Sequence, residues 1–188
     1  SAIDEAELKL LHIAAGNLVQ NNQPSMAYLQ HGIEVTLHNG HELKNDIVYL
    51  ADYKNIDNND FLLVNQWTYV EKSKKRADLI LFLNGLPIVL MELKSPSREE
   101  TDASAAYRQL KNYMKEIPTM FTYNVFCVMS DMAESKAGTI TASEDRYMQW
   151  KSKDGVYESA EVVDYDVFFE GMFRKDRLLD IIRNFICY

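Results

Sequence analysis

The chain has few cysteines and no long apolar run, and these absences exclude several classes of protein. Only 2 of 188 residues are cysteine. Cys127 lies inside an apolar segment and Cys187 stands one residue from the end, so we expect buried or terminal thiols and not a disulfide framework. No apolar run approaches the roughly 18 residues of a membrane-spanning helix, and the first residues lack the basic-then-apolar order of a signal peptide. The sequence therefore predicts a cytoplasmic protein that does not contact membranes.

Two further absences concern positive charge and nucleotides. With 20 Lys and Arg against 28 Asp and Glu, the net charge is -8, which argues against a protein that coats nucleic acid through bulk electrostatics. No segment matches the G-x4-G-K-[ST] phosphate loop, so we expect no P-loop ATP hydrolysis in this chain. The remaining composition, 47% hydrophobic and 26% charged, is typical of a globular protein and predicts one domain over residues 1–188.

Basic side chains are densest immediately before Asp78. The cluster consists of Lys72, Lys74, Lys75 and Arg76, and it ends two residues before that aspartate. Such a cluster could hold a DNA backbone beside an acidic site. The alternative is a solvated turn between two strands.

Local periodicity predicts an α/β domain. The expected elements are a helix from Ser1 or Asp4 that fades at 21–24, strands at 33–37 and 47–50, one or two strand segments within 61–70, strands at 79–83 and 87–93, a helix from Thr101 or Asp102 to Pro118, a strand at 123–129, minor edge structure within 139–155, and a helix over 178–185. The strands at 79–83 and 87–93 are apolar on both faces, so we expect them at the centre of the sheet. The sum is a mixed central β-sheet flanked by α-helices, without internal repeats.

Charged residues end the second of these central strands. Glu92 and Lys94 follow the apolar run 87–91. Residues two apart in a strand face the same side, so both project to one surface while Leu93 packs behind them. Asp78 begins the partner strand and lies across from them. The alternative is that these charges are only a solvated exit from the sheet.

The turn between the two strands decides whether Asp78 meets Glu92. A regular two-residue turn at Asn84-Gly85 would set Asp78 opposite Met91 and turn Glu92 to the other face. A three-residue loop or a single bulge restores the parity. We therefore predict a loop of odd length, with a positive φ at Gly85 or a neighbour. A regular two-residue turn without a bulge would contradict a shared site.

Two converging carboxylates and an ammonium group suggest metal-assisted phosphodiester hydrolysis. Oxygen donors suit a hard cation such as Mg²⁺, which polarises a phosphodiester and lowers the pKa of a bound water. Lys94 would orient or activate that water and stabilise the pentavalent phosphorane.

Longer segments resemble a known family. The resemblance is to the N-terminal nuclease region of type I restriction enzyme R subunits, within the PD-(D/E)xK superfamily that includes the RecB-like nucleases. It is carried by residues 59–67 and 76–94, by a Q-x3-Y element formed by Gln109 and Tyr113, and by residues 117–124, 130–131 and 177–185. The proline that usually precedes the first catalytic aspartate is Ala77 here, a departure that leaves the metal ligands intact.

The resemblance implies a restriction-endonuclease-like PD-(D/E)xK core and a role for each site residue. Asp78 and Glu92 would bind Mg²⁺ together with the Leu93 carbonyl, and Lys94 would serve the water. Gln109 and Tyr113 are four residues apart on one helix face, so both could reach the metal site or the DNA backbone. The alternative for Tyr113 is a core aromatic. An acidic residue of the first helix, Glu5 or Glu7, could approach the site as in related nucleases.

The resemblance also implies a function. It is that of the Mg²⁺-dependent endonuclease domain of a type I site-specific deoxyribonuclease, as an N-terminal part of a longer R subunit. That domain would cut double-stranded DNA without sequence specificity of its own, after ATP-driven translocation by motor domains and in complex with methyltransferase and specificity subunits. ATP would bind only the longer subunit. Two alternatives stay open: a docking module with the nuclease fold, and a stand-alone repair nuclease that cuts with Mg²⁺ and no ATP.

Overall fold

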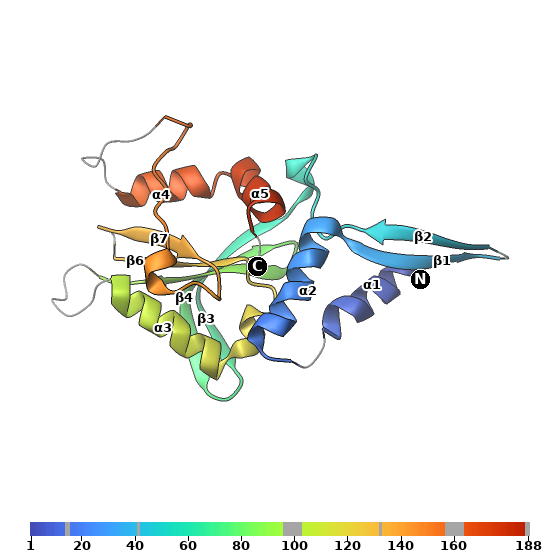
Figure 1. Cartoon of the computed structure of the whole chain (residues 1–188), viewed down its shortest axis with the longest axis horizontal. Coiled ribbons are helices and arrows are strands. Elements are labelled where there is room, and N and C mark those ends of the chain that lie inside the picture. Colours follow the sequence, from blue (N-terminus) through green and yellow to red (C-terminus); the bar gives the residue numbers. More distant parts are fainter. Residues whose placement is uncertain (14–15, 41, 96–102, 132, 157–163, 187–188) are drawn as a thin grey trace.

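A computed structural model describes residues 1–13, 16–40, 42–95, 103–131, 133–156 and 164–186 (Figure 1). The elements are α1 (Ala2–Leu11), α2 (Leu18–His31), β1 (Ile33–Asn39), β2 (Glu42–Val48), a 3-10 helix at Ile56–Asn58, β3 (Phe61–Val70), β4 (Lys74–Leu83), β5 (Leu86–Leu93), α3 (Ala103–Glu116), a 3-10 helix at Pro118–Phe121, β6 (Phe126–Ser130), β7 (Ser135–Gly138), a 3-10 helix at Glu144–Arg146, α4 (Asp164–Met172) and α5 (Lys175–Asn184). This order of helices and strands confirms the predicted α/β class.

A mixed five-stranded sheet forms the body of the molecule. Its strands lie in the order β3-β4-β5-β6-β7. β5 and β6 pair in parallel, with α3 in the connection between them, and the other neighbouring strands of this sheet pair antiparallel. The two apolar strands predicted to be central, β4 and β5, do lie inside the sheet, because each is flanked by two other strands. The fold is restriction-endonuclease-like, with helices on both sides of this sheet (Figure 1).

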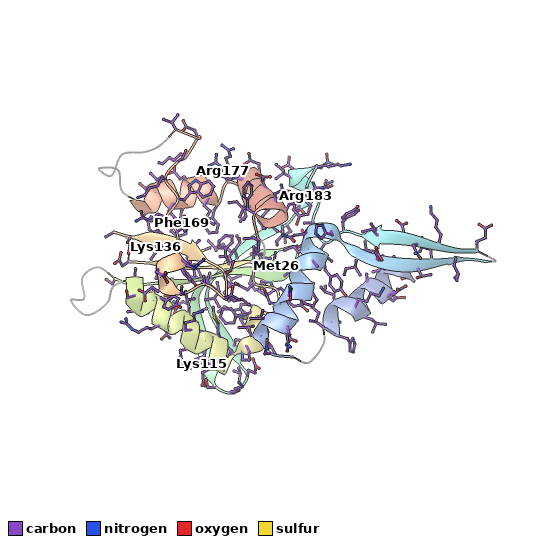
Figure 2. All side chains as sticks on the ribbon, in the orientation of Figure 1. Met26, Lys115, Lys136, Phe169, Arg177 and Arg183 are labelled. Carbon is purple, nitrogen blue, oxygen red and sulfur yellow. The ribbon has the colours of Figure 1, made fainter. Side chains whose placement is uncertain are left out.

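The two faces of the sheet pack against different helices. On one face Ile80, Leu90 and Cys127 pack with Ala106 and Leu110 of α3. On the other face a larger cluster joins apolar strand residues to α2, α4 and α5, including Met26 and Phe169 (Figure 2). Burying strands on both faces explains their nearly continuous apolar runs. The predicted state of Cys127 is confirmed, since its thiol is free and buried, while Cys187 lies outside the described residues.

The N-terminal region forms an arm beside the body. α1 packs on the β1–β2 hairpin, a separate two-stranded sheet, around Ala6, Ile33 and Val35 (Figure 1). The hairpin was predicted, although its second strand, β2, begins and ends earlier than the predicted 47–50. Of the two predicted caps of α1, the structure shows Ser1, whose hydroxyl accepts a hydrogen bond from the Asp4 amide at 3.3 Å.

The single first helix that the sequence predicts is wrong, because the segment forms two helices. Asn17 caps α2 in a reciprocal box with Gln20. The helix then continues through Pro24 to His31. The polar residues that looked like a helix end have tertiary partners: the buried Asn22 amide donates to the carbonyls of Phe121, Thr122 and Asn124, about a hundred residues away. Contacts at that separation are invisible to local periodicity.

Differences also occur near the C-terminal end. α4 was not predicted, while the predicted last helix is confirmed as α5. The expected edge structure begins earlier than predicted, at β7, and Ala137 of that strand bridges Met148. The predicted caps Thr101 and Asp102 lie outside the described residues. Within the described part of the chain, each helix is too short or too polar to cross a lipid bilayer.

Candidate active site

The turn that joins β4 to β5 has two residues, so the predicted loop of odd length is wrong. Asn84 and Gly85 have φ values of +49° and +84°, and Leu83 pairs with Leu86 across them. The predicted positive φ at Gly85 is confirmed. Two left-handed residues in succession form the hairpin turn whose twist matches that of the flanking strands.

A bulge in β5 restores the parity that this turn would remove. Phe82 pairs with Pro87 while Leu81 pairs with Val89, so Ile88 has no partner in β4. Proline has no N–H to give to the ladder, which makes the neighbouring position suitable for a bulge. Beyond the bulge Leu79 pairs with Met91, and the same register continued by one pair sets Asp78 opposite Glu92.

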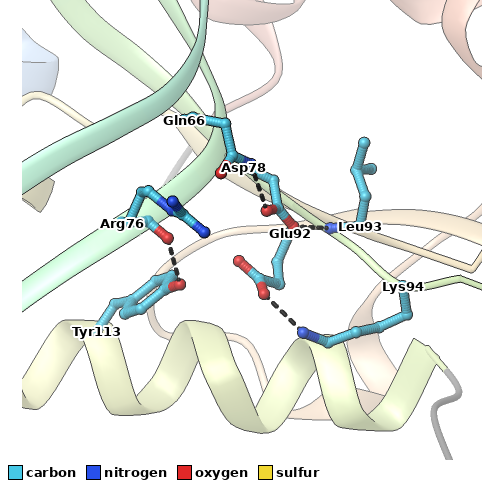
Figure 3. Close-up of polar contacts among 7 residues, drawn as sticks. All are labelled: Gln66, Arg76, Asp78, Glu92, Leu93, Lys94 and Tyr113. Carbon is cyan, nitrogen blue, oxygen red and sulfur yellow. Dashed lines mark hydrogen bonds and ion pairs between the residues drawn. The ribbon is translucent and has the colours of Figure 1, made fainter.

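Glu92 is buried with one oxygen paired and one without a partner. Its residue is 4% exposed, and the Lys94 ammonium donates to Oε1 at 2.6 Å (Figure 3). Oε2 is buried and has no hydrogen-bond partner. Burial raises the pKa of Glu92, as does the charge of Asp78, while the bond from Lys94 lowers it. The nearby Tyr113 hydroxyl makes the smallest contribution, and it too lowers the pKa of Glu92.

Asp78 is fixed by a donor on each oxygen. Oδ1 accepts from the side-chain amide of Gln66 at 3.2 Å, and Oδ2 accepts from the Leu93 backbone N–H at 2.9 Å (Figure 3). Three neighbouring strands therefore hold this carboxylate: β3 through Gln66, β4 through its own backbone, and β5 through Leu93.

Tyr113 lies beside these residues but has no free surface. It is 2% exposed, and its hydroxyl donates to the carbonyl of Arg76 at 2.9 Å. Burial raises the pKa of Tyr113 to about 12, against a hydrogen bond from Gln109 that lowers it. The ring of Tyr113 therefore packs between α3 and the sheet, as the core-aromatic alternative expects. Its hydroxyl links α3 to β4 close to the carboxylates. Gln109 is half-buried next to it.

The basic cluster divides into residues with different surroundings. Lys72 donates through its ammonium to the Lys115 carbonyl at 2.9 Å and through its backbone N–H to that of Glu116, so it joins the β3–β4 turn to the end of α3. Lys74 and Arg76 are exposed and Lys75 is half-buried. The Arg76 side chain extends toward the two carboxylates (Figure 3).

Several residues around the site were not singled out in the sequence. A cavity of about 460 Å³ contains Asp78 and Lys94 and is also lined by Asn65, Gln66, Ser130 and Tyr165. Asn65-Gln66 interrupts an apolar strand directly across from Asp78, a signal that could have been noticed. Tyr165 comes from α4 and had no local signal. Glu5 accepts from the Thr36 amide and pairs with Lys9 within the arm.

The donors present fit a hard cation. Nowhere in the described ranges do three His, Cys, Asp or Glu side chains gather as a metal site, so the candidate set consists of two carboxylates and main-chain oxygen. A buried carboxylate oxygen without a partner is costly, and Glu92 Oε2 is such an atom. Oxygen donors of this kind suit Mg²⁺ better than a soft metal.

The mixed sheet with an aspartate, a glutamate and a lysine at the ends of its paired central strands defines a member of the restriction-endonuclease-like fold class. The family model described as "Type I restriction enzyme R protein N terminus" matches residues 2–146. The chain belongs to that family.

Similar curated proteins agree with this family. The chain is 33% identical to the type I restriction enzyme HindI endonuclease subunit of Haemophilus influenzae, over 100% of this chain and 18% of that protein. It is also 33% identical to the putative MjaIXP endonuclease subunit of Methanocaldococcus jannaschii, over 85% of this chain and 17% of that protein. The chain therefore spans less than a fifth of the length of these relatives.

Proposed function

We propose that the chain is the endonuclease domain of a type I restriction enzyme R subunit and hydrolyses DNA phosphodiester bonds with Mg²⁺. The observation that carries this proposal is the state of Glu92, which is buried, paired to Lys94 through one oxygen and unpaired at the other. Removing a carboxylate from water costs several kcal/mol unless all its bonds are replaced. Because the fold keeps this costly group opposite a second carboxylate, we infer that the two carboxylates bind a ligand together.

The residues that would hold the metal ion are Asp78, Glu92 and the Leu93 carbonyl. When bound, the ion would polarise the phosphodiester and lower the pKa of the attacking water. Lys94 leaves Glu92 Oε2 free because it occupies Oε1. The Lys94 side chain is half-buried and the residue lines the cavity, so its ammonium group can orient a water and stabilise negative charge on the phosphorane.

Other residues would support this chemistry. Tyr113 holds the strand that carries Asp78, through the Arg76 carbonyl, and Gln109 restrains the Tyr113 hydroxyl. Lys74, Lys75 and Arg76 can contact DNA phosphates, whereas Lys72 already binds a carbonyl. Contacts to phosphates position a protein on DNA but carry no sequence information. Cleavage by this domain would therefore be nonspecific.

The rest of the activity would come from outside this domain. We propose that site recognition comes from methyltransferase and specificity subunits, and that ATP-driven translocation comes from motor domains of a longer subunit. The substrate would be double-stranded DNA that those motor domains have moved.

The test is Lys94→Ala in the assembled restriction enzyme. We expect DNA cleavage to fall by roughly 10³-fold, as when a group that stabilises transition-state charge is removed, while ATP-driven translocation continues. Lys136→Ala is a matched control, because Lys136 also pairs with a glutamate two residues away, Glu134, at 2.5 Å. That control should cut normally.

The outcomes separate the candidate functions. Cleavage lost with translocation retained supports the nuclease. Loss of subunit assembly would instead identify a docking module. Efficient cutting by the isolated chain with Mg²⁺ and no ATP would identify a stand-alone nuclease, and wild-type cutting by Lys94→Ala would refute the proposal.

A further inference from the structure

Gln66 has a backbone conformation that a β-strand does not require. In the described part of the chain, Gln66 and Asn84 are the non-glycine residues with positive φ, at +53° and +49°. Asn84 is explained by its hairpin turn, but Gln66 lies within β3. A left-handed backbone conformation is uncommon and energetically costly for a residue other than glycine. Such a strained conformation persists only where the surrounding structure requires it.

The position of Gln66 in the sheet shows which part of the structure requires this conformation. Asn65 pairs with Leu79 and Trp67 pairs with Ala77, which sets Gln66 opposite Asp78. Ala77 packs in the core under α3 while Leu79 packs in the core on the other face. Residues two apart in a regular strand would share a face. The strand pair is therefore irregular at Gln66 and Asp78, and this irregularity sets the direction of both side chains.

The hydrogen bond that results is too weak to justify the strain by its effect on stability. The Gln66 amide donates to Asp78 Oδ1 at 3.2 Å, and the bond is exposed to solvent. Water competes for a hydrogen bond that is exposed to solvent, so this bond contributes little net stability and does not offset the cost of the left-handed backbone. Stability alone gives no reason for this arrangement.

We propose that Gln66 is a positioning residue for Asp78. Its amide fixes Oδ1 while the Leu93 N–H fixes Oδ2, so the carboxylate is oriented before a metal ion arrives. Each carboxylate oxygen keeps a second lone pair for that ion. Partners that orient a metal ligand in this way typically change metal affinity or activity by about 10- to 100-fold. The inference rests on the proposed nuclease function.

Two substitutions separate the amide from the backbone. Gln66→Gly removes the side chain and relieves the left-handed strain, so the denaturation midpoint should stay or rise. Gln66→Met keeps the size and the backbone strain but removes the donor. In the assembled enzyme we expect both variants to cut DNA about 10- to 100-fold more slowly and to need about 10-fold more Mg²⁺ for half-maximal rate.

A second readout does not depend on cleavage. Mn²⁺ binding, followed by electron paramagnetic resonance, should weaken about 10-fold in both variants. Thr68→Ala is the control, because Thr68 is exposed on the same strand two residues away, and it should bind Mn²⁺ and cut DNA like the wild type.

The results that would overturn the inference are specific. Wild-type Mn²⁺ affinity and Mg²⁺ dependence in both variants would refute it. A defect in Gln66→Gly but not in Gln66→Met would assign the effect to the backbone and also refute it. Failure of the nuclease proposal is seen separately, because only then does Lys94→Ala cut normally; cutting lost in Lys94→Ala but normal in the Gln66 variants refutes the role of Gln66 alone.

Discussion

The two ends of the β4–β5 hairpin differ in how fully the hydrogen bonds of their polar side chains are satisfied. At the closed end, Asn84 accepts from the Asp60 amide at 2.8 Å and donates to the Leu50 carbonyl at 2.9 Å and to Asn59 at 3.0 Å. At the open end, Glu92 is more deeply buried yet leaves one oxygen unpaired. The hydrogen bonds at the closed end stabilise the fold, whereas the unpaired carboxylate oxygen at the open end destabilises it.

The same contrast holds for the two left-handed residues. Asn84 lies where a hairpin needs a positive φ, and its side chain is fully used. Gln66 lies where a strand does not need one, and its side-chain amide donates an exposed hydrogen bond to Asp78. Strain that local structure does not explain is found beside the carboxylates. Strain and unpaired charge thus mark the end of the hairpin where we place the chemistry.

The largest expected effect comes from moving the carboxylate across the strand. Exchanging residues 91 and 92 (Met91→Glu with Glu92→Met) keeps the composition but places the acid on the opposite face, in the apolar cluster that holds Met91. We expect cleavage and Mn²⁺ binding to disappear and the free energy of unfolding to fall by several kcal/mol, because an unpaired buried charge is costly. Denaturant unfolding, metal binding and cleavage assays measure these effects.

A second exchange in the same strand is the control for this experiment. Exchanging residues 89 and 90 (Val89→Leu with Leu90→Val) alters core shape without moving a charge, and should cost about 1–2 kcal/mol with cleavage retained. Cleavage by the first exchange variant would show that the face of Glu92 does not matter, and would remove the contrast between the hairpin ends.

A smaller effect is expected at the closed end. Asn84→Ala removes three hydrogen bonds and puts a Cβ without compensating contacts in a left-handed conformation. We expect the free energy of unfolding to fall by about 2–3 kcal/mol, while the cleavage rate per folded molecule stays unchanged. Urea denaturation with an activity titration checks both numbers.

Asn84→Gly sharpens this result, because glycine accepts the positive φ and loses only the hydrogen bonds. Its loss should be about 1 kcal/mol smaller than that of Asn84→Ala. A large drop in cleavage by well-folded Asn84→Gly would mean that the two ends are not independent.

The smallest expected effect concerns Glu92 and pH. Burial raises its pKa above the ordinary value of 4.5, so the ionised form is disfavoured by folding. This cost is fully present above the raised pKa and is absent below pH 4.5, where the group is protonated in both states. Glu92→Gln should therefore make the metal-free protein more stable at pH 8, with the gain vanishing toward pH 4.

Glu134→Gln is the matched control, since Glu134 also pairs with a lysine but its side chain is 39% exposed. We expect it to give no gain at any pH. Denaturant unfolding of the metal-free proteins across this pH range measures the difference, and a loss of stability in Glu92→Gln at pH 8 would contradict the assignment of Glu92 as a costly residue.

Much of this architecture could be predicted from the sequence, for reasons that lie in single segments. The apolar runs 79–83 and 87–93 identified the central strands, and the i, i+2 spacing placed Glu92 and Lys94 on one surface. The alternation rule also showed that the turn decides whether Asp78 meets Glu92. The sequence could not choose between a longer loop and a bulge, because that choice depends on how Pro87 and Ile88 fit the neighbouring strand.

What could not be predicted depends on distant contacts. Asn22 looked like the end of a helix, but its amide binds carbonyls about a hundred residues away, so α2 continues past it. Tyr165 reaches the cavity from α4, far along the chain from Asp78. The conformation of Gln66 follows from the meeting of two strands and leaves no mark in composition or period. The roles of the individual site residues stay predictions until the variants are made.

The unpaired oxygen of Glu92 has a practical consequence. A cation that settles there binds the folded chain and not the unfolded one, so it should raise the melting temperature in proportion to the logarithm of its concentration once binding is saturated. A dye-based melting curve with different divalent salts would then rank the ions by affinity, with no DNA, no ATP and no other subunit in the tube.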